Sequence, residues 1–594
     1  MIYIYIHILG INNIYIYILY EFGSCQTGVR QLPNPSFAAV RPWFGICQTR
    51  VWQLPSSGLT AYSGANDADD EDDADAGVRA LHPGGDFCLA SDSDMEEAAE
   101  GMYDDDGGGC CFSDAPSEAP SNATSPDQLS FSSVDSDAHA TPTFDRGSAA
   151  PEPSQGDPQI LSRWPALLLQ ALVLVLTVGE LHRSLLVFPN LLLTSHFTGI
   201  GTAEVAVQML SSAVNDAVGC NLAWNFLHCY EKDPTCRQIL LQRPGLGCIF
   251  GDIAEYSRGL LQLMKQKTLD PDEAWEQLQH DFALRGGFCH QHQQTCNHVA
   301  GHCDISGSPC QPWSRIGKRR GRHDVRFALT LCWILWVLTA RPWVAIHENV
   351  VGFDRNIFVE RLGAFYGIIH IIVRPADMGY RFTSRPRLFT VLWLKASVAM
   401  VHDISATYDR VSQAVRKWQP VLSLSSIYTR DQQLLLQVEN MFRAKRHLPC
   451  LAAASSDWTC LLGESETKFL GTYLAMWKAV TGKEAHTDKN CLFNLGQNPN
   501  LRRCWTNRRG AMPTMTAASR KLWSPYLRRW LIPSEIASAM GFNTGTSAQT
   551  GVPVDPAAAL YSYKCLGNAM NVASVGGVFA CALACLHPID PGGS

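Results

Sequence analysis

The sequence predicts an α/β fold built on a mostly parallel sheet. From about residue 188 onward, short apolar segments typical of strands alternate with segments typical of helices. This alternation is the pattern of a parallel sheet covered by helices. Several predicted strands are followed at once by a glycine, an acid or a cysteine, and ligands bind at the carboxyl ends of parallel strands. Between about residues 395 and 525 the alternation stops, which indicates an inserted segment.

The first predicted strand leads into a loop rich in glycine. The apolar run Leu191–Leu193 precedes the segment His196–Glu204, which contains Phe197, Gly199 and Gly201. Glycines at these positions allow a ligand to approach the backbone closely. A single Gly-x-Gly is a weak signal, so this loop gains meaning only from the elements that follow it.

Acidic residues end the next two predicted strands. Glu231 follows the second strand, and Asp252 follows the third one at Cys248–Gly251. Asp233 and Pro234 are typical of a helix N-cap and first turn. In a parallel sheet both acids lie at the same edge as the glycine loop. The alternative is that these acids only cap helices or face solvent.

Cys310 is the strongest candidate for a nucleophile. It lies in the turn Ser308–Gln311, just past a short apolar strand and before the basic loop Lys318–Arg322. Nearby Lys and Arg side chains favour a thiolate, which is the nucleophilic form. The alternative is an ordinary buried structural cysteine.

Charged residues also mark the later strands. Glu348 ends a strand that begins near Trp343, and Arg385 and Arg387 enter the strand Leu388–Trp393 at alternate positions, so they point the same way. A cysteine, a glutamate and an arginine pair at successive strand ends are the groups needed to attack an electron-poor ring. The pattern also predicts a helix at Phe327–Leu338, a strand at Gly363–Val373 and a small-residue helix at Asn568–Leu586.

In this order, these segments resemble the motifs of the cytosine-5 DNA methyltransferase family. The resemblance covers residues 188–590, about two thirds of the chain. It rests on the glycine loop, the two acids, the Pro-Cys-Gln turn, the Glu-Asn-Val strand end, the arginine pair, the segment Pro533–Glu535 and the pair Gly567-Asn568. Thr383 stands where the family usually has glutamine, and Ser534 replaces an arginine, which puts base positioning in doubt more than bond making.

The resemblance implies a Rossmann-like S-adenosylmethionine-dependent methyltransferase sheet with an inserted target-recognition domain and a disordered acidic amino-terminal region. It also implies that S-adenosylmethionine binds at the glycine loop, with Glu231 on the ribose and Asp252 on the adenine. The implied cofactor-binding residues are Phe197, Gly199, Gly201, Glu231, Asp252 and Asn568.

The resemblance further implies a covalent reaction on a flipped cytosine of double-stranded DNA. Cys310 adds to C6 of the base, Glu348 binds N3 and the exocyclic amine, and Arg385 and Arg387 give electrostatic support. A DNA substrate implies a nuclear protein, which we expect to be a monomer. Two alternatives remain open: a cytosine-5 methyltransferase acting on tRNA, and a catalytically inactive DNA- or chromatin-binding relative.

The charge distribution agrees with a nucleic-acid partner. The net charge of −7 combines an acidic amino-terminal region, including the run Asp67–Asp75, with basic clusters in the second half. The alternative for each cluster is a solvated face. The residues expected to bind nucleic acid are Lys318, Arg319, Arg320, Arg322, Arg508 and Arg509.

We divide the chain into five regions. Residues 1–24 are an Ile/Tyr repeat of doubtful origin, of the kind that translation of an AT repeat would give. Residues 25–160 are a low-complexity segment expected to be disordered. Protein partners of this acidic segment are unknown. The remaining regions are the catalytic and cofactor-binding domain at 161–394, the target-recognition domain at 395–530, and the carboxy-terminal part of the catalytic domain at 531–594.

The cysteines and apolar stretches bear on the compartment. The 21 cysteines show no regular disulfide spacing, so a reducing compartment is expected. Residues 1–20 lack the basic start and cleavage site of a signal peptide. The apolar segment Pro165–Gly179 is shorter than the roughly 18–20 residues that span a bilayer, so we expect a buried helix and no membrane partner.

A run of Cys and His residues between 289 and 303 is a separate candidate. Cys289, His292, Cys296 and His298 could form a tetrahedral zinc site. The spacing is irregular and no second Cys-x-x-Cys pair supports it. We therefore predict a polar loop without metal, with zinc at these four residues as the alternative.

Overall fold

The computed structural model describes the chain in two compact units, Met1–Asp137 and Ala138–Ser594. The described residues are 2–8, 14–20, 159–177, 180–181, 188–218, 221–314, 319–418, 422–506, 510–515, 521–542 and 563–589. In the first unit, β1 (Ile2–Ile8) and β2 (Ile14–Tyr20) form an antiparallel pair. Most of the segment predicted to be disordered, together with Lys318, Arg508 and Arg509, lies outside the described residues.

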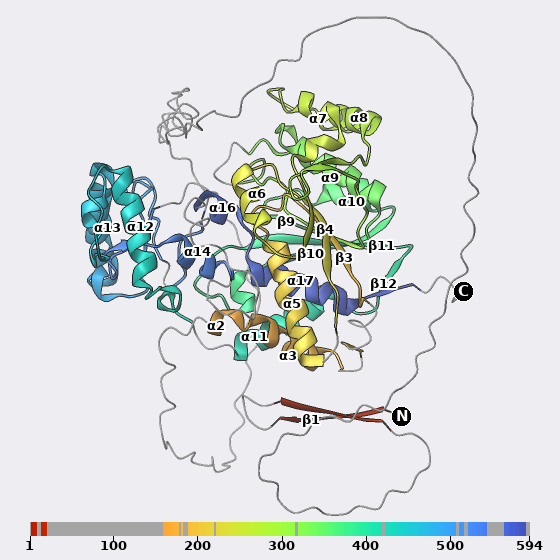
Figure 1. Cartoon of the computed structure of the whole chain (residues 1–594), viewed down its shortest axis with the longest axis horizontal. Helices are drawn as coiled ribbons and strands as arrows, with labels where there is room; N and C mark the ends of the chain where they lie inside the picture. Colours follow the sequence, from red (N-terminus) through yellow and green to blue (C-terminus); the bar gives the residue numbers. More distant parts are fainter. Residues whose placement is uncertain are drawn as a thin grey trace, which may run out of the picture. The chain divides into compact units, whose positions relative to one another are not determined.

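The second unit is organised around a seven-stranded sheet (Figure 1). Its strand order is β10-β11-β9-β8-β3-β4-β5, and only β11 runs antiparallel to its neighbours. The strands are β3 (Leu192–His196), β4 (Asn225–Tyr230), β5 (Leu246–Phe250), β8 (Cys303–Ser306), β9 (Val344–Val350), β10 (Tyr366–Val373) and β11 (Arg387–Leu394). The predicted mostly parallel α/β sheet is confirmed.

Strand β3, the first strand of this sheet along the chain, lies at a topological switch point. From β3 the chain moves to β4 and β5 on one side, and later returns to β8 on the other side of β3. In open parallel sheets such a point opens a crevice at the carboxyl ends of the strands, where ligands bind. The glycine loop follows β3 and the Pro-Cys turn follows β8, so both flank this point.

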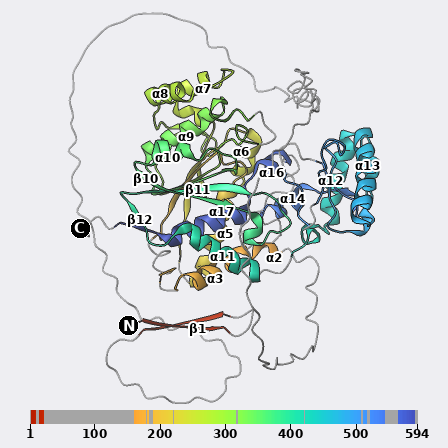
Figure 2. The same ribbon diagram turned by 180° about the vertical axis from the view of Figure 1, so that it is seen from behind.

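Helices cover both faces of the sheet (Figures 1 and 2). One layer contains four mutually packed helices, and the other contains α9 with its neighbours. The first layer is α3 (Trp164–Val175), α5 (Thr202–Val218), α11 (Ile404–Trp418) and α17 (Val572–Cys585). The second is α7 (Arg258–Leu263), α8 (Pro271–Asp281), α9 (Phe327–Ala340) and α10 (Asn356–Leu362), with the 3-10 turn η1 (Ile253–Tyr256).

The central helices are apolar on all sides because they are enclosed. In α9, ten residues from Phe327 to Val337 are buried. Two glycines of α17 leave room for large side chains of neighbouring elements. A Cβ at Gly576 would lie 2.1 Å from the Trp164 ring, and one at Gly577 would lie 2.8 Å from the Met378 sulfur. Among the described residues, only Tyr563–Cys585 is long and apolar enough to span a membrane, and 94% of its most apolar window is buried inside the protein.

The helices of the inserted segment lie together apart from the sheet (Figure 2), and this segment has a hydrophobic core of its own. It contains Trp458, Tyr473, Trp477 and Trp523, and draws on α12 (Gln432–Lys445) and α13 (Glu464–Thr481). The expected start of the insert at residue 395 needs correction. Helix α11 packs with α3 and α17 in the main core through Ile404, Tyr408, Val411 and Val415, so the separate core begins only after it.

The remaining elements are short. They are α2 (Gln159–Ser162), α6 (Pro234–Leu241), β6 (Gly287–Cys289), β7 (Gln294–Cys296), β12 (Val398–Met400), β13 (Phe493–Asn494), β14 (Leu522–Ser524), β15 (Arg529–Trp530), α14 (Pro533–Ala539), α16 (Tyr563–Asn568) and β16 (Leu586–Pro588), with 3-10 turns at Gly321–His323, Pro375–Met378, Leu424–Ile427, Thr459–Leu461 and Ala485–Thr487.

Candidate active site

The Pro-Cys turn is fixed to the neighbouring strand through Ser308. The buried Ser308 hydroxyl lies 2.9 Å from His347 Nε2, and Asn349 Nδ2 donates to the Ser308 carbonyl at 3.1 Å. Thr330 Oγ1 donates to the same hydroxyl at 3.0 Å. Because His347 and Asn349 flank Glu348 on β9, these bonds set the position of the turn relative to Glu348.

Cys310 is half-buried, and its thiol is held in the protonated form. Burial raises the pKa of Cys310, the Glu348 carboxylate raises it further, and Arg387 and Arg385 lower it. The expectation of a favoured thiolate is therefore wrong in its direction. Among the described residues, Arg385, Arg387 and also Arg326 act on the thiol through their charge, and burial outweighs the arginine pair.

Glu348 and Arg387 form an ion pair beside the thiol. The Arg387 Nε lies 3.1 Å from Glu348 Oε1, and both side chains are largely buried. Glu348 Oε1 has no well-aligned hydrogen-bond donor among the described residues. A Cβ on Gly307 would lie 3.4 Å from Glu348 Oε2, so this glycine keeps the space beside the carboxylate open.

Arg385 is placed differently from its neighbour. Its Nη1 donates to the carbonyl of Met515 at 2.9 Å and to that of Gly567 at 3.0 Å. Burial and the repulsion of Arg387 lower the pKa of Arg385 to about 9. Arg385 thus joins the end of the insert to the carboxy-terminal segment. Its positive charge also lowers the pKa of Cys310.

The glycine loop has the backbone that its sequence requires. Gly199 has φ of 61° and Gly201 has φ of 83°, and Phe197 also has a positive φ of 55°. A Cβ at Gly201 would lie 2.8 Å from Arg243 Nε, whereas one at Gly199 would meet no atom within 4 Å. Gly201 is therefore needed for packing, and Gly199 faces open space.

The two acids lie at the ends of β4 and β5, as predicted. Glu231 accepts the backbone N–H of Gly199 at 2.6 Å, and burial raises the pKa of this carboxyl. Asp252 lies 3.3 Å from Lys232 Nζ and caps the following turn by accepting from Ala254 N at 3.1 Å. The alternative reading of Asp252 as a capping residue is therefore also met by the structure.

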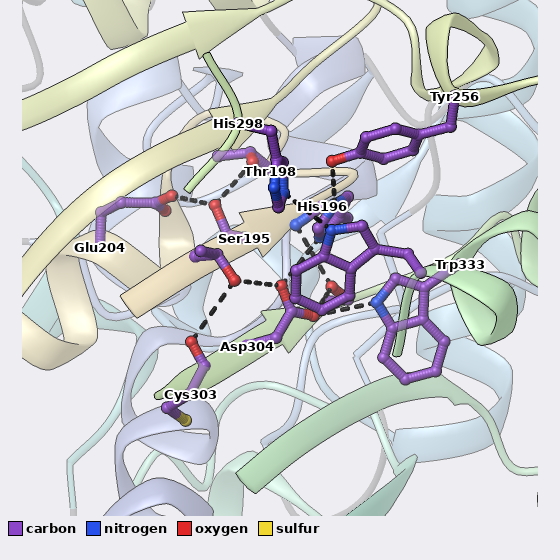
Figure 3. Close-up of polar contacts among 12 residues, drawn as sticks. Ser195, His196, Thr198, Glu204, Tyr256, His298, Cys303, Asp304 and Trp333 are labelled. Atoms are coloured by element: carbon purple, nitrogen blue, oxygen red, sulfur yellow. Dashed lines mark hydrogen bonds and ion pairs between the residues drawn. The ribbon is translucent and has the colours of Figure 1, made fainter. Parts of the chain in front are cut away.

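A buried polar network lies next to the glycine loop, where β3 ends (Figure 3). Asp304, in the middle of β8, lies 2.8 Å from His196 Nδ1, and accepts from Thr194 Oγ1 at 2.8 Å and Trp333 Nε1 at 2.9 Å. His196 Nε2 lies 3.3 Å from the Tyr256 hydroxyl. The sequence analysis missed this network, although an acid inside a short apolar strand was a signal for it.

Glu204 is a second buried acid beneath the loop. Ser195 Oγ donates to Glu204 Oε1 at 2.5 Å, while Glu204 Oε2 has no partner among the described residues. Burial raises the pKa of Glu204 to about 7, against the smaller opposing effects of the Ser195 bond and of Arg243.

The carboxy-terminal motif lies against α6. On α16, Cys565 Sγ lies 3.3 Å from Cys236 Sγ of α6, and Lys564 Nζ lies 3.5 Å from Asp233. Asn568 is exposed at the end of α16. The segment thus returns to the helix that follows Glu231.

Three predicted nucleic-acid-binding arginines fall within the described residues. Arg319 and Arg320 are exposed, and Arg320 Nη1 donates to the Lys267 carbonyl at 2.9 Å. Arg322 is bound to Asp354 and Glu360, each at 2.7 Å. Its charge is compensated within the protein, so a phosphate would have to compete with these two carboxylates.

The two departures from the family pattern have local partners. Thr383 Oγ1 donates to the Ala539 carbonyl at 2.9 Å. Beside Ser534, Glu535 receives two bonds from Arg529, at 2.9 and 2.7 Å. The arginine missing at Ser534 therefore does not leave Glu535 without a cation.

Comparison with known protein families identifies one domain in the chain. Residues 303–579, which contain the Pro-Cys turn, Glu348 and the arginine pair, match the sequence profile of the C-5 cytosine-specific DNA methylase family. This segment is a C-5 cytosine-specific DNA methylase domain. The glycine loop and the two acids lie before the matched residues. No curated protein sequence is matched.

Among solved structures, several methyltransferases align weakly with the chain. A candidate prophage-encoded DNA modification methyltransferase of E. coli is 13% identical with a TM-score of 0.37, and covers 66% of this chain and 98% of its own. The S. pombe Dnmt2 methyltransferase is 15% identical with a TM-score of 0.32, at 66% and 97% coverage. The Entamoeba histolytica methyltransferase EhMeth is 13% identical with a TM-score of 0.32, also at 66% and 97%.

The zinc alternative of the sequence analysis needs correction in one ligand. His298 accepts a hydrogen bond from Trp336 Nε1 at 2.9 Å, and burial lowers its pKa to about 4. The lone pair of the neutral His298 ring is thus already used by Trp336. Cys289, His292 and Cys296 converge instead with Cys248 of β5.

Proposed function

We propose that this methyltransferase acts on DNA and methylates C5 of a flipped cytosine through a covalent adduct with Cys310. The observation that carries the proposal is the junction of β8 and β9. Ser308 holds the Cys310 turn to the residues on either side of Glu348, and Arg387 pairs with Glu348 at 3.1 Å. A nucleophile, an acid and a cation therefore share one edge of the sheet.

The residues present fit S-adenosylmethionine. The edge beside β3 offers open space at Gly199, and Glu231 and Asp252 end the next two strands. Carboxylates can accept the hydroxyl and amine protons of a nucleoside. We propose that these residues, with Phe197, Gly201 and Asn568, hold the cofactor, which supplies the methyl group when bound.

The chemistry of the chain itself starts from a protonated thiol. Cys310 must lose its proton to solvent as its sulfur adds to C6 of the base, a step that makes C5 nucleophilic. After the methyl group has been transferred to C5, loss of the C5 proton to solvent and breaking of the C6–S bond would release the product and restore the thiolate. Glu348, by hydrogen bonding to N3 and the exocyclic amine, would stabilise the charge that develops on the ring. Engagement of Glu348 by the base also reduces its repulsion of a Cys310 thiolate, so base binding and thiol activation are coupled.

Arg387 has two tasks in this account. Before the base enters, it neutralises Glu348, and afterwards its charge favours the thiolate of Cys310. Arg385 contributes a second positive charge from a fixed position. We further propose a nuclear location, because the proposed substrate is DNA, and a monomeric state.

The test is transfer of a labelled methyl group from S-adenosylmethionine to double-stranded DNA and to tRNA in parallel, followed by base-resolution mapping. We expect 5-methylcytosine in DNA, lost in Cys310→Ser and kept in Cys450→Ser, a change at an exposed cysteine. Methylation of tRNA alone would replace the DNA assignment. Absence of transfer to both would favour an inactive relative.

A further inference from the structure

Four side chains from two separate parts of the chain converge at the edge of the sheet. Cys248 lies on the edge strand β5, and Cys289, His292 and Cys296 come from the hairpin β6–β7. The donor atoms of all four lie within 4.8 Å of one another. We propose that they bind one zinc ion that fixes the hairpin to β5.

The spacing of the donor atoms matches a tetrahedral site. His292 Nδ1 lies 3.6 Å from Cys248 Sγ, and 3.4 Å from both Cys289 Sγ and Cys296 Sγ. With Zn–S bonds of about 2.3 Å and a Zn–N bond of about 2.0 Å, tetrahedral angles give an S···N separation of about 3.5 Å. The three separations therefore agree with one central ion.

Hydrogen bonding does not explain the convergence. A neutral imidazole offers one lone pair at Nδ1, which can accept one S–H, while three sulfurs surround this atom. A disulfide would also leave one thiol over, and these cysteines are free in the structure. A shared cation satisfies all four donors together.

The surrounding backbone supports a thiolate ligand. Ile249 N–H donates to Cys289 Sγ at 3.4 Å, and His290 N–H donates to the Ile249 carbonyl at 2.7 Å. Hydrogen bonds to ligand sulfurs are typical supports of metal sites. The hairpin thus already covers the exposed edge of β5, and the ion would lock it there.

The ligand set indicates zinc in a structural role. Three thiolates and one imidazole are soft donors that suit tetrahedral Zn²⁺. All four positions come from the protein, which leaves no place for a substrate. The ligand Cys248 lies on β5 itself, which leads directly into Gly251 and Asp252. The ion would therefore also stabilise the strand end that carries Asp252.

The first experiment measures metal content in the full-length protein, purified without chelators, by plasma mass spectrometry. We expect about one zinc per chain. Cys248→Ser and His292→Asn should each lose at least about four fifths of it, whereas the exposed Cys450→Ser should keep it. Cys248→Ser is the sharpest variant because this residue lies far from the hairpin in sequence.

The second experiment needs no variant and so does not depend on mutant folding. X-ray absorption at the zinc edge of the unmodified protein should show three sulfurs at about 2.3 Å and one nitrogen at about 2.0 Å. Protein that neither contains zinc nor takes up zinc or cobalt would overturn the proposal. A shell without three sulfurs, full zinc in Cys248→Ser, or an intact mass showing a disulfide among these cysteines would do the same.

Discussion

Arg387 Nε lies 3.1 Å from Glu348 Oε1, and both groups act on the thiol of Cys310 with opposite sign. The carboxylate raises the pKa of the thiol, and the guanidinium lowers it. Burial is larger than either effect and keeps the thiol protonated. The pair therefore adjusts how easily the Cys310 thiol loses its proton.

This arrangement predicts opposite effects of two variants on thiol reactivity. Glu348→Gln should lower the pKa of Cys310, and Arg387→Gln should raise it, because each removes one charge and keeps a polar side chain. The rate of alkylation of Cys310 by iodoacetamide, followed by peptide mass spectrometry across pH, measures this. Shifts in the same direction in both variants would contradict the electrostatic account.

Methyl transfer should also depend on pH with a defined sign. Because the pKa of Cys310 is raised, the thiolate fraction and kcat/KM should increase as pH rises from 6.5 through 9. The profile of Glu348→Gln should move to lower pH even though its maximal rate is reduced. A wild-type rate that falls over this range would show that thiol ionisation does not limit the reaction.

The two arginines should differ in their contribution to stability. Arg385→Ala removes two bonds to buried carbonyls, and charged hydrogen bonds are worth roughly 1.5–3 kcal/mol each. Arg387→Ala removes one ion pair whose two side chains keep 15% and 11% of their surface exposed, so water can partly replace the lost contact and we expect a smaller loss. Urea unfolding of both variants checks this, and equal losses would refute the structural role of Arg385.

Glu204 should make folding sensitive to pH. Its pKa is raised to about 7, so the folded state holds its proton more tightly than the unfolded state. The stability that follows is complete at low pH and is lost as pH rises through about 7. Between pH 5.5 and 8.5 the loss should be about 2 kcal/mol, and Glu204→Gln should remove that component. An unchanged pH dependence in the variant would exclude this assignment.

The basic residues should separate into two classes in DNA binding. Arg508→Ala with Arg509→Ala should weaken binding and reduce the log–log salt slope by roughly one unit per lost phosphate contact. Arg322→Ala should leave the slope unchanged, since its charge is already paired with Asp354 and Glu360. Salt titrations of DNA affinity test this. Equal slopes in the wild type and the double variant would remove Arg508 and Arg509 from the interface.

The sequence predicted those parts of the fold and site that depend on local pattern. The strands, their order along the chain, and the positions of Cys310, Glu348 and Glu231 at strand ends follow from short apolar runs with a polar residue after them. A parallel sheet then brings these ends to one edge, whatever the loops between them. This is why residues far apart in sequence could be assigned to one site.

Contacts between distant segments were not predictable in the same way. The sequence around Arg385 does not indicate that the side chain bonds to the carbonyls of Met515 and Gly567. Cys248 was assigned only to a strand, because its link to the hairpin appears only when β5 is seen at the edge of the sheet. The thiolate argument failed for the same reason: it used charges near in sequence and could not include burial.

The most direct measurement of the central claim is the trapping of Cys310 on DNA that contains 5-fluorocytosine. Fluorine at C5 blocks the final loss of a proton, so the adduct with C6 should accumulate in the presence of S-adenosylmethionine. We predict a denaturation-resistant complex for the wild type and Cys450→Ser, with the modified peptide containing Cys310, and none for Cys310→Ser. A complex that persists in Cys310→Ser, or its absence from a wild-type protein that methylates DNA, would contradict the account.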